Sequence, residues 1–308
     1  MKGTDTNTAK IIEPYKAEEK EGILYGRGSS DMKSGCAVMM SAFIEASKYK
    51  DRKGDIYLVF TTDEEYAGYG ILEAMEKNLI PNCDFALIAE PTDGIIQTAH
   101  NGNAWLEVCF YGKSAHASQP ELGNNTINMA GEFICKFKNY TKQVSLLEGD
   151  KIYGNPKFNI GVINGGTGPN IVPAYTSIKI DKRYLPNDNI ETFIKEINNI
   201  IEECKKEDKS FSAETKVIVN CPPVVVNRDC KLLLNIKEAI DKVWKNSVEF
   251  GIMPCWGEGG YINKFNIPVV YFGPGNLSEA HTINEKCSIS MIKDSYEAYL
   301  NILKEICI

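Results

Sequence analysis

Short apolar runs alternate with helical patterns toward both ends of the chain, and this alternation constrains the fold more than any other feature. Polar residues, glycine or proline bound each apolar run, as they bound buried strands. The runs are residues 56–60, 85–89 and 268–272, and the helical patterns cover about residues 31–50, 70–78, 231–244 and 290–306. Strands that alternate with helices predict an α/β fold, with a mostly parallel sheet and flanking helices.

The middle of the chain has a different order of elements. We expect strands at residues 105–111, 157–163, 176–183 and 214–220, and helices at residues 125–141 and 189–206. The order strand–helix–strand–strand–helix–strand is that of a ferredoxin-like α+β unit. We therefore predict one domain made of residues 1–103 and 223–308, interrupted by a second domain at residues 104–222, because surface loops tolerate such insertions.

Composition excludes several classes of protein. The 308 residues suffice for two domains, and the net charge of −7 argues against nucleic acid or anionic membrane as a partner. No apolar run is long enough to cross a membrane, and the first ten residues lack the apolar stretch of a signal peptide. Ten cysteines without a CxxC pair indicate reduced thiols, so we expect a cytoplasmic protein.

Acidic residues follow the predicted strands at the ends where α/β sheets bind ligands. Glu64 and Glu65 follow the run at 56–60, Glu90 follows the run at 85–89, and Asp31 begins the first helix. His281, one of only three histidines, lies beyond the run at 268–272. Four carboxylates in one crevice would repel each other and raise each other's pKa, which a divalent cation would relieve. Carboxylate and imidazole ligands together favour zinc, cobalt or manganese.

Each of these residues also has a simpler interpretation. Asp31 alone suits a helix N-cap, residues 63–65 alone suit a charged turn, and His281 alone suits a loop. The joint pattern at successive junctions favours a metal site. Because neighbours on a strand point to opposite faces, Glu64 and Glu65 can serve one site only beyond the end of the strand. One of the two can then bind metal while the other stays free as a base.

Five motifs in fixed order carry a family resemblance. They are LYGRGSSDMKSG at 24–35, TDEE at 62–65, AEPT at 89–92, GKSAHAS at 112–118 and AHT at 280–282. The chain, from about Tyr15 onward, resembles the zinc-dependent amidohydrolases and metallopeptidases that include acetylornithine deacetylase, succinyl-diaminopimelate desuccinylase, aminoacylase and glutamate carboxypeptidase. The resemblance implies a zinc-exopeptidase-like catalytic domain, interrupted by a ferredoxin-like lid through which two subunits form a homodimer.

The resemblance also implies a role for each candidate residue of the catalytic domain. Asp31 resembles the carboxylate that bridges two metal ions. Glu65 and His281 resemble the other ligands of one ion, and Glu90 resembles a ligand of the second. Glu64 resembles the general base. A cis peptide bond between Asp31 and Met32 is implied as well.

In the lid, His116 resembles the histidine that reaches the partner subunit's site and polarises the scissile carbonyl. Asn170 and Arg183 resemble residues that hold a substrate carboxylate, for which the planar guanidinium of arginine is well suited. A surface ion pair is the simpler interpretation of Arg183. The implied activity is hydrolysis of an amide bond in an N-acyl amino acid or small peptide by metal-activated water, with two Zn²⁺, or Co²⁺ or Mn²⁺, per subunit.

One departure from the family concerns the second metal ion. The family carries a His-x-Asp motif before the Gly-Arg-Gly segment, but here no histidine precedes Gly26, and His100 does not match the missing position. We therefore expect an N-terminally truncated, poorly soluble chain that binds at most one ion tightly. An inactive remnant or a binding protein without turnover remains the alternative. The sequence leaves open the role of Glu258, and which acyl group and amine are cleaved.

Overall fold

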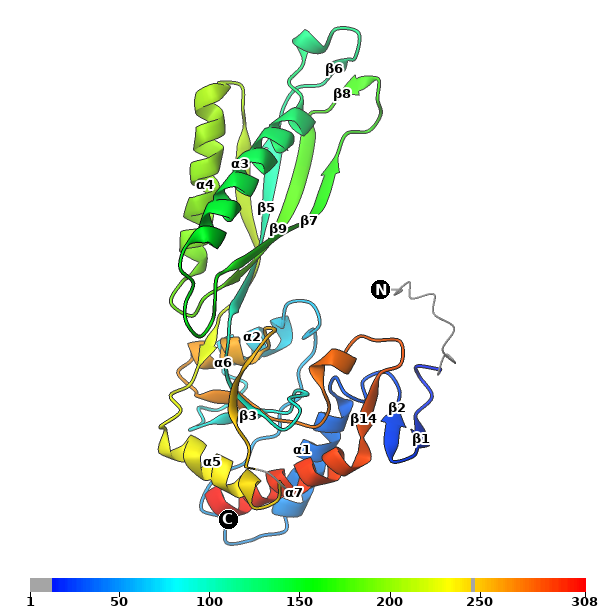
Figure 1. Cartoon of the computed structure of the whole chain (residues 1–308), viewed down its shortest axis with the longest axis vertical. Coiled ribbons are helices and arrows are strands. Elements are labelled where there is room, and N and C mark those ends of the chain that lie inside the picture. The colour runs from blue at the N-terminus through cyan, green and yellow to red at the C-terminus, as the bar shows by residue number, and fades with distance from the viewer. Residues whose placement is uncertain (1–12, 245–246) are drawn as a thin grey trace.

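The computed structural model describes residues 13–244 and 247–308. Its two parts lie end to end in an elongated molecule (Figure 1). We call the part from β5 (Gly102–Tyr111) to β10 (Ala213–Cys221) the insert, and the remaining described residues the base. The first twelve residues of the predicted range 1–103 lie outside the described residues.

A five-stranded sheet forms the centre of the base. Its strands are β3 (Ala86–Ile88), β4 (Ile96–His100), β11 (Val224–Val225), β12 (Phe250–Met253) and β13 (Val269–Tyr271). The order is β11-β4-β13-β3, with β12 also pairing with β4. The pairs β12–β4 and β13–β3 are parallel, whereas β11–β4 and β13–β4 are antiparallel, so the sheet is mixed. The strands predicted at 85–89 and 268–272 are confirmed as β3 and β13.

Helices flank this sheet, as the α/β class requires. They are α1 (Lys33–Ala46), α2 (Tyr69–Glu76), α5 (Lys231–Asp241), α6 (Gly259–Lys264) and α7 (Ile289–Ile306). Helix α7 packs against α1 and α5 beneath the sheet (Figure 1). Buried side chains such as Val38, Ala298 and Ile302 belong to the core of the base. The four predicted helices are confirmed, and the α/β fold class is confirmed with them. A small sheet of β1 (Glu18–Lys20), β2 (Ile23–Tyr25) and β14 (Lys286–Ser288) completes the base.

The strand predicted at residues 56–60 is wrong. No described strand pairs with this segment, so it shares none of the hydrogen-bond ladders that define a strand. Its side chains alternate in exposure, and Tyr57, Val59 and Phe60 are 49%, 40% and 50% exposed. The alternation of apolar residues in the sequence indicates an extended backbone. It does not indicate whether a neighbouring strand is present to pair with it.

The insert has the predicted ferredoxin-like order. Its other main elements are α3 (Thr126–Leu146), β7 (Lys157–Gly165), β9 (Tyr175–Tyr184) and α4 (Ile190–Glu207). The antiparallel sheet runs β10-β5-β9-β7, and both helices pack on one face over buried Phe110, Phe133 and Phe193. Asn125 and Asn189 cap the two helices through their side-chain oxygens. A short pair, β6 (Ala115–His116) and β8 (Ile171–Val172), forms the tip farthest from the base (Figure 1).

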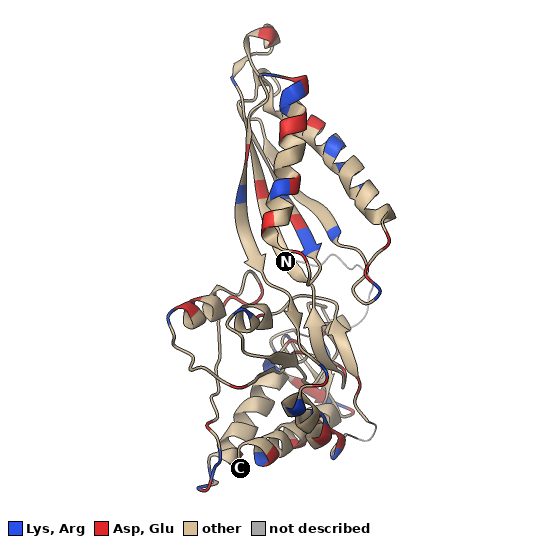
Figure 2. Ribbon diagram, turned by 90° about the vertical axis from the view of Figure 1, so that its left-hand side faces the viewer, with Lys and Arg blue, Asp and Glu red and all other residues tan. Residues whose placement is uncertain are grey.

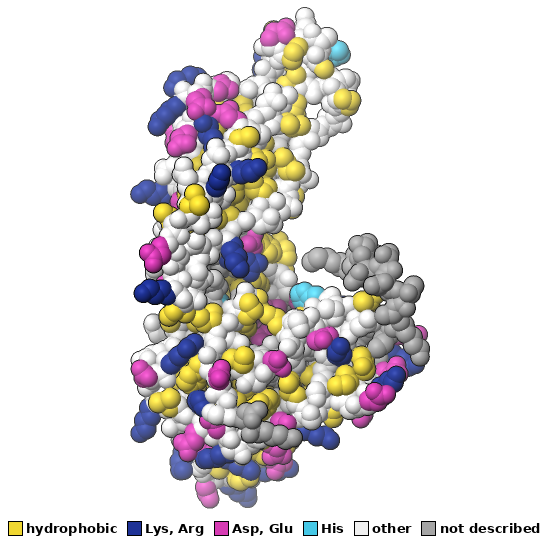
Figure 3. Space-filling model, in the orientation of Figure 1, with side chains coloured by type: hydrophobic (Ala, Val, Ile, Leu, Met, Phe, Trp, Pro, Cys, Tyr) yellow, Lys and Arg dark blue, Asp and Glu magenta, His cyan; other side chains and the backbone are white. Residues whose placement is uncertain are grey.

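The surface of the described residues has mixed charge and one hollow side. Acidic and basic residues are interspersed over both parts of the described chain (Figure 2). The molecule is hollowed on one side between the insert and the base, and hydrophobic side chains of the insert overlook this hollow (Figure 3). Within the described residues, no helix combines the length and the apolar character needed to cross a membrane.

Candidate active site

Three side chains from distant segments meet in the base. The His281 Nε2 atom lies 2.8 Å from Glu65 Oε2 and 3.3 Å from Asp31 Oδ2. One ligand atom from each residue lies within 4.8 Å of the other two. Ligands bound at about 2.0–2.1 Å around a tetrahedral zinc ion are about 3.3 Å apart. The donor types and their separations therefore fit a divalent cation.

The backbone around this cluster adopts uncommon conformations. His281 has φ +61° and Asp63 has φ +70°, in the left-handed region that residues other than glycine seldom occupy. Such conformations persist where the surroundings determine them, and they concentrate at functional sites. The peptide bond between Asp31 and Met32 is cis, as the resemblance implied.

The pKa values of two further predicted residues, Glu64 and Glu90, are raised in part by the negative charges of the cluster. Burial raises the pKa of Glu64 to about 8, and the negative charges of Asp31, Glu258 and Glu65 act in the same direction. Burial also raises the pKa of Glu90 well above 4.5, followed by the charges of Glu64 and Asp31. Glu90 directly follows β3 and is 9% exposed. A bound cation would favour the charged form of every carboxylate here and lower these pKa values.

Glu285 is a site residue that the sequence analysis missed. Its side chain is 2% exposed and lies beneath the loop that carries Asp31. Glu285 Oε1 accepts hydrogen bonds from the backbone N–H groups of Ser30 and Asp31, both at 2.9 Å. Glu285 Oε2 accepts one from Gly28 N at 3.0 Å and pairs with Arg27 at 2.8 Å. The sequence clue that could have pointed to Glu285 is its position four residues after His281, just beyond the AHT motif.

The pKa of Glu285 is lowered by this anchoring. Burial works to raise it, but the hydrogen bonds from Asp31, Gly28 and Ser30, with the charge of Arg27, lower it below its ordinary value. The carboxylate form is thus the one that the loop recognises. Glu285 fixes the backbone of Asp31, while Asp31 presents its side chain to His281.

Two of the three predicted residues of the insert, His116 and Asn170, lie at its tip and are not brought to this cluster within one chain. His116 lies in β6 at the tip, where its Nδ1 atom lies 2.8 Å from the Ser118 hydroxyl. Asn170 lies beside it, and its carbonyl accepts a hydrogen bond from Ala117 N. The tip and the base are at opposite ends of the elongated molecule (Figure 1). Arg183 lies in β9, where its Nε atom donates to Asp181 Oδ1 at 3.0 Å.

His100 is a structural residue. It is fully buried, its Nε2 atom lies 2.8 Å from the Tyr271 hydroxyl, and its Nδ1 atom lies 2.8 Å from the carbonyl of Asn101. Both ring nitrogens are therefore occupied, and His100 is unsuited to replace a missing metal ligand. Burial lowers the pKa of His100 to about 4, so the folded protein holds this ring neutral.

Replacing His100 with glutamine should leave metal content unchanged and reduce the sensitivity of the fold to acid. In the wild type, the stability that comes from holding His100 neutral is fully present above the ordinary pKa of 6.5. It is lost as pH falls toward the pKa of about 4 in the folded protein. This depressed pKa corresponds to about 3 kcal/mol across that window. Urea unfolding between pH 6.5 and pH 4, with metal analysis of the same samples, provides the check. H116Q is the matched control, and a loss of metal in H100Q alone would contradict this assignment.

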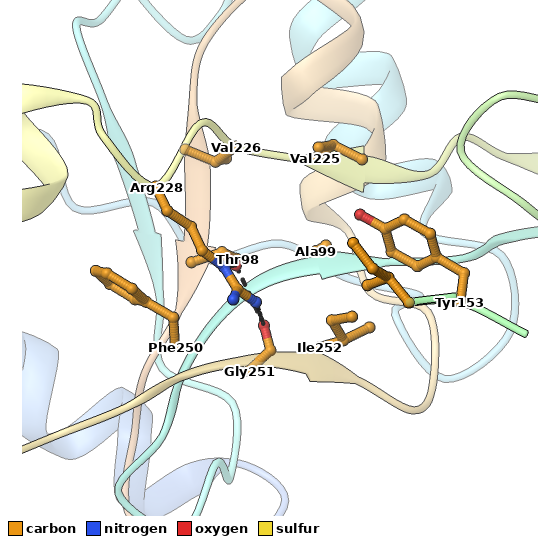
Figure 4. A pocket seen from close by; sticks show the side chains of 10 residues that line it. Thr98, Ala99, Tyr153, Val225, Val226, Arg228, Phe250, Gly251 and Ile252 are labelled. Carbon is orange, nitrogen blue, oxygen red and sulfur yellow. Dashed lines mark hydrogen bonds between the residues drawn. The ribbon is translucent and has the colours of Figure 1, made fainter. Parts of the chain in front are cut away.

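A separate cavity does not belong to the cluster. Its volume is about 530 Å³, and it lies between the base sheet and the loop of the insert that carries Tyr153 (Figure 4). Arg228 projects along it and donates hydrogen bonds to Thr98 Oγ1 and to the Gly251 carbonyl, while Phe250 lies alongside (Figure 4). None of the three cluster residues lines this cavity, and neither does Glu64 or Glu90.

The fold and the cluster together define a class of protein. A mixed α/β base gathers carboxylates and one imidazole around a position suited to a cation, and a ferredoxin-like unit is inserted into it. That combination is the architecture of a metal-dependent hydrolase.

Comparisons with known proteins agree with this class. The family model "Peptidase family M20/M25/M40" matches residues 3–305. A probable succinyl-diaminopimelate desuccinylase of Staphylococcus aureus (strain MRSA252) is 31% identical, over 95% of this chain and 76% of its own length. The succinyl-diaminopimelate desuccinylase of Sulfurimonas denitrificans is 29% identical, over 94% of this chain and 78% of its own. The crystal structure of aminopeptidase PepT from Bacillus cereus has a TM-score of 0.73 at 24% identity, covering 94% of this chain and 76% of that one.

The chain therefore belongs to peptidase family M20/M25/M40, which confirms the resemblance found in the sequence. It is a metal-dependent hydrolase of amide bonds. The alternative of an inactive remnant or a binding protein finds no support in these comparisons.

Proposed function

We propose that the chain removes an acyl group from an N-acyl amino acid, or cleaves a small peptide, at a single zinc ion held by Asp31, Glu65 and His281. The observation that carries this proposal is the convergence of these three ligands, with Glu64 beside them. The relatives named as desuccinylases favour an N-acyl substrate with a carboxylate-bearing acyl group.

Glu64 acts as the general base in this proposal. A bound divalent cation would polarise the substrate carbonyl and make water more acidic. Glu64 takes the proton of the attacking water and returns it to the nitrogen of the leaving amine, so that one carboxylate serves as base and then as acid. Asp31 and Glu65, whose charges act on Glu64, would hold the cation, and the positive charge of the cation would favour the ionised form of Glu64.

The histidine count supports one ion rather than two. The chain has three histidines; His281 lies in the cluster, His100 is engaged with Tyr271, and His116 lies at the tip of the insert. Glu90 and Asp31 together would give a second ion two carboxylates without an imidazole from the same chain, which is a poor zinc site. We therefore propose one tightly held zinc ion per chain.

Metal removal should abolish hydrolysis reversibly. We expect dialysis against a chelator to remove the activity, and one equivalent of Zn²⁺ per chain to restore most of it, because the polarising cation is essential to the reaction. Mass spectrometric metal analysis and amide hydrolysis should be followed in the same titration. Restoration only after two equivalents would overturn the one-ion proposal, and full activity in metal-free protein would overturn the metal-dependent reaction itself.

A panel of paired substrates tests the proposed specificity. N-succinyl and N-acetyl derivatives of the same amino acid, and dipeptides of matched length, should be compared by kcat/KM with the zinc-loaded protein. We expect the N-succinyl compound to be favoured, because the relatives that this chain matches are named as desuccinylases. Preference for dipeptides would contradict the acyl group proposed here without contradicting amide hydrolysis.

We further propose a homodimer formed through the insert. Strand β7 is an edge of the insert sheet, and its side chains Val162 and Ile163 are 42% and 55% exposed. Unpaired edge strands readily pair with another chain. Since His116 and the cluster lie far apart in one subunit, a second copy supplies the simplest way to bring them together.

Mixing two inactive variants tests this arrangement. Hybrid dimers of Glu64→Gln with His116→Ala should recover activity, because one of their two sites then combines an intact Glu64 with an intact His116. Activity should be measured after subunit exchange has been verified by native mass spectrometry. Exchange without recovery would show that His116 does not act across the dimer.

The remaining part of the proposal is a cytoplasmic location. All ten cysteines are free thiols, and none pairs with another in the described chain. Proteins of reducing compartments keep their thiols in this form.

A further inference from the structure

Segment 61–68 carries Glu64 and Glu65, and helix α6 holds it at both ends. Near its start, Thr61 Oγ1 donates a hydrogen bond to Glu258 Oε2 at 2.6 Å. Near its end, the carbonyl of Ala67 accepts a hydrogen bond from the Tyr261 hydroxyl at 2.8 Å. Glu258 is the N-cap residue of α6, and Tyr261 lies three residues later, on the same face of the helix.

The residues between these two contacts are tightly packed against α6. Gly68 has φ +63°, and a Cβ atom there would approach Tyr261 Cε2 to 3.1 Å and Glu258 Cγ to 3.5 Å. Tyr261 is 2% exposed, and Ala67 is fully buried. The second oxygen of Glu258, Oε1, is shielded from solvent and has no hydrogen-bond partner among the described residues. Buried polar atoms of this kind call for an explanation beyond simple stability.

We propose that Glu258 and Tyr261 form a clamp, the α6 clamp, which positions segment 61–68 so that Glu64 faces the reacting atoms. Both are positioning residues, because they touch the segment through Thr61 and Ala67 and do not belong to the cluster of ligands. The hydrogen-bonding ability of the Glu258 side chain is what the clamp requires. This inference rests on the proposed role of Glu64 as the base.

The clamp also contacts the point where the chain leaves the insert. Cys221, the last residue of β10, has its Sγ atom 3.0 Å from the Tyr261 hydroxyl. Its carbonyl accepts a hydrogen bond from the Tyr184 hydroxyl at 3.1 Å. The clamp therefore lies between the insert and segment 61–68, and it contacts both. A movement of the insert at Cys221 would therefore act on the same tyrosine that holds Ala67.

Two matched pairs of variants test the clamp in the zinc-loaded protein. Thr61→Val and Glu258→Ala remove the hydrogen bond, whereas Thr61→Ser and Glu258→Gln retain a donor and an acceptor. We expect the first pair to lower kcat about 10-fold or more with KM changed less than about twofold, and the second pair to stay within about threefold of the wild type. The double variant T61V/E258A should lose no more than either single variant, because both remove the same bond.

Hydrogen exchange of the metal-free protein gives a readout that does not depend on catalysis. The amides of Tyr66, Ala67 and Gly68 donate to the Asp63 carbonyl, so their protection reports the order of the segment. We expect faster exchange in this segment for E258A, T61V and Tyr261→Phe, and no change for E258Q and T61S. Tyr299→Phe is the matched control, because it removes another buried tyrosine–carbonyl hydrogen bond, to Phe272, away from the segment.

The outcomes separate the clamp from the proposed function. If E258Q is as damaging as E258A, or if E258A leaves exchange unchanged, the clamp is refuted whatever the activity. If exchange rises in the predicted variants but kcat stays at the wild-type value, the segment is clamped but does not position the base, and the inference fails at that step. A wild-type protein without amide hydrolysis would refute the proposed function while the exchange measurements still decide the clamp.

Discussion

Replacing Glu64 with glutamine should remove nearly all amide hydrolysis while leaving the metal in place. The amide is close in shape to the carboxylate but cannot accept the proton of the attacking water, and a general base contributes about 10²–10⁴-fold to the rate. Glu64 is not one of the three residues that converge on the cation position, so metal binding should survive. The measurements are kcat with the zinc-loaded variant and metal content per chain.

The control for this variant is another glutamate of the base. Glu73 lies on the exposed surface of α2 and pairs with Lys77, so E73Q changes the same functional group outside the site. It should keep wild-type kcat. If E64Q retains more than a tenth of the wild-type rate, Glu64 is not the base; if E64Q loses its metal, Glu64 is a ligand instead.

The sequence was most informative where local pattern and tertiary structure agree. The order of elements in the insert could be predicted because each strand and helix has the length and period of its type, and each helix has an asparagine cap. The convergence of Asp31, Glu65 and His281 could be anticipated from the ordered motifs that contain them. A position at a strand end explains Glu90, which follows β3, but not Glu65, because residues 56–60 form no strand.

Two features could not be predicted from local pattern. Residues 56–60 have a strand-like period, but strand formation depends on a neighbour that a sequence window does not contain. Glu285 was not among the predicted site residues, because its importance arises from backbone groups about 255 positions away in the sequence. Backbone donors carry no signature in the sequence, so a carboxylate that binds them is recognised only in the folded chain.

Replacing Glu285 with alanine should cause a large loss of stability in the base. The substitution would leave Arg27 and the N–H groups of Gly28, Ser30 and Asp31 without their acceptor. Removing one partner of a buried, hydrogen-bonded charge costs about 3–5 kcal/mol. We expect a loss of that size in urea unfolding followed by far-ultraviolet circular dichroism, accompanied by weaker metal binding, because the loop that presents Asp31 would no longer be fixed.

Two further variants show whether the charge or the shape of Glu285 matters. Glu285→Gln keeps one acceptor oxygen but turns an NH₂ group toward donors, so it should recover only part of the lost stability. Glu45→Ala removes a glutamate that pairs with Lys48 at the surface of α1, and it should leave unfolding and metal binding close to the wild type. A stable E285A protein that binds zinc with wild-type affinity would show that the Asp31 loop is fixed by contacts other than Glu285. Selective loss of metal from E285A at unchanged global stability would instead confine the role of Glu285 to that loop.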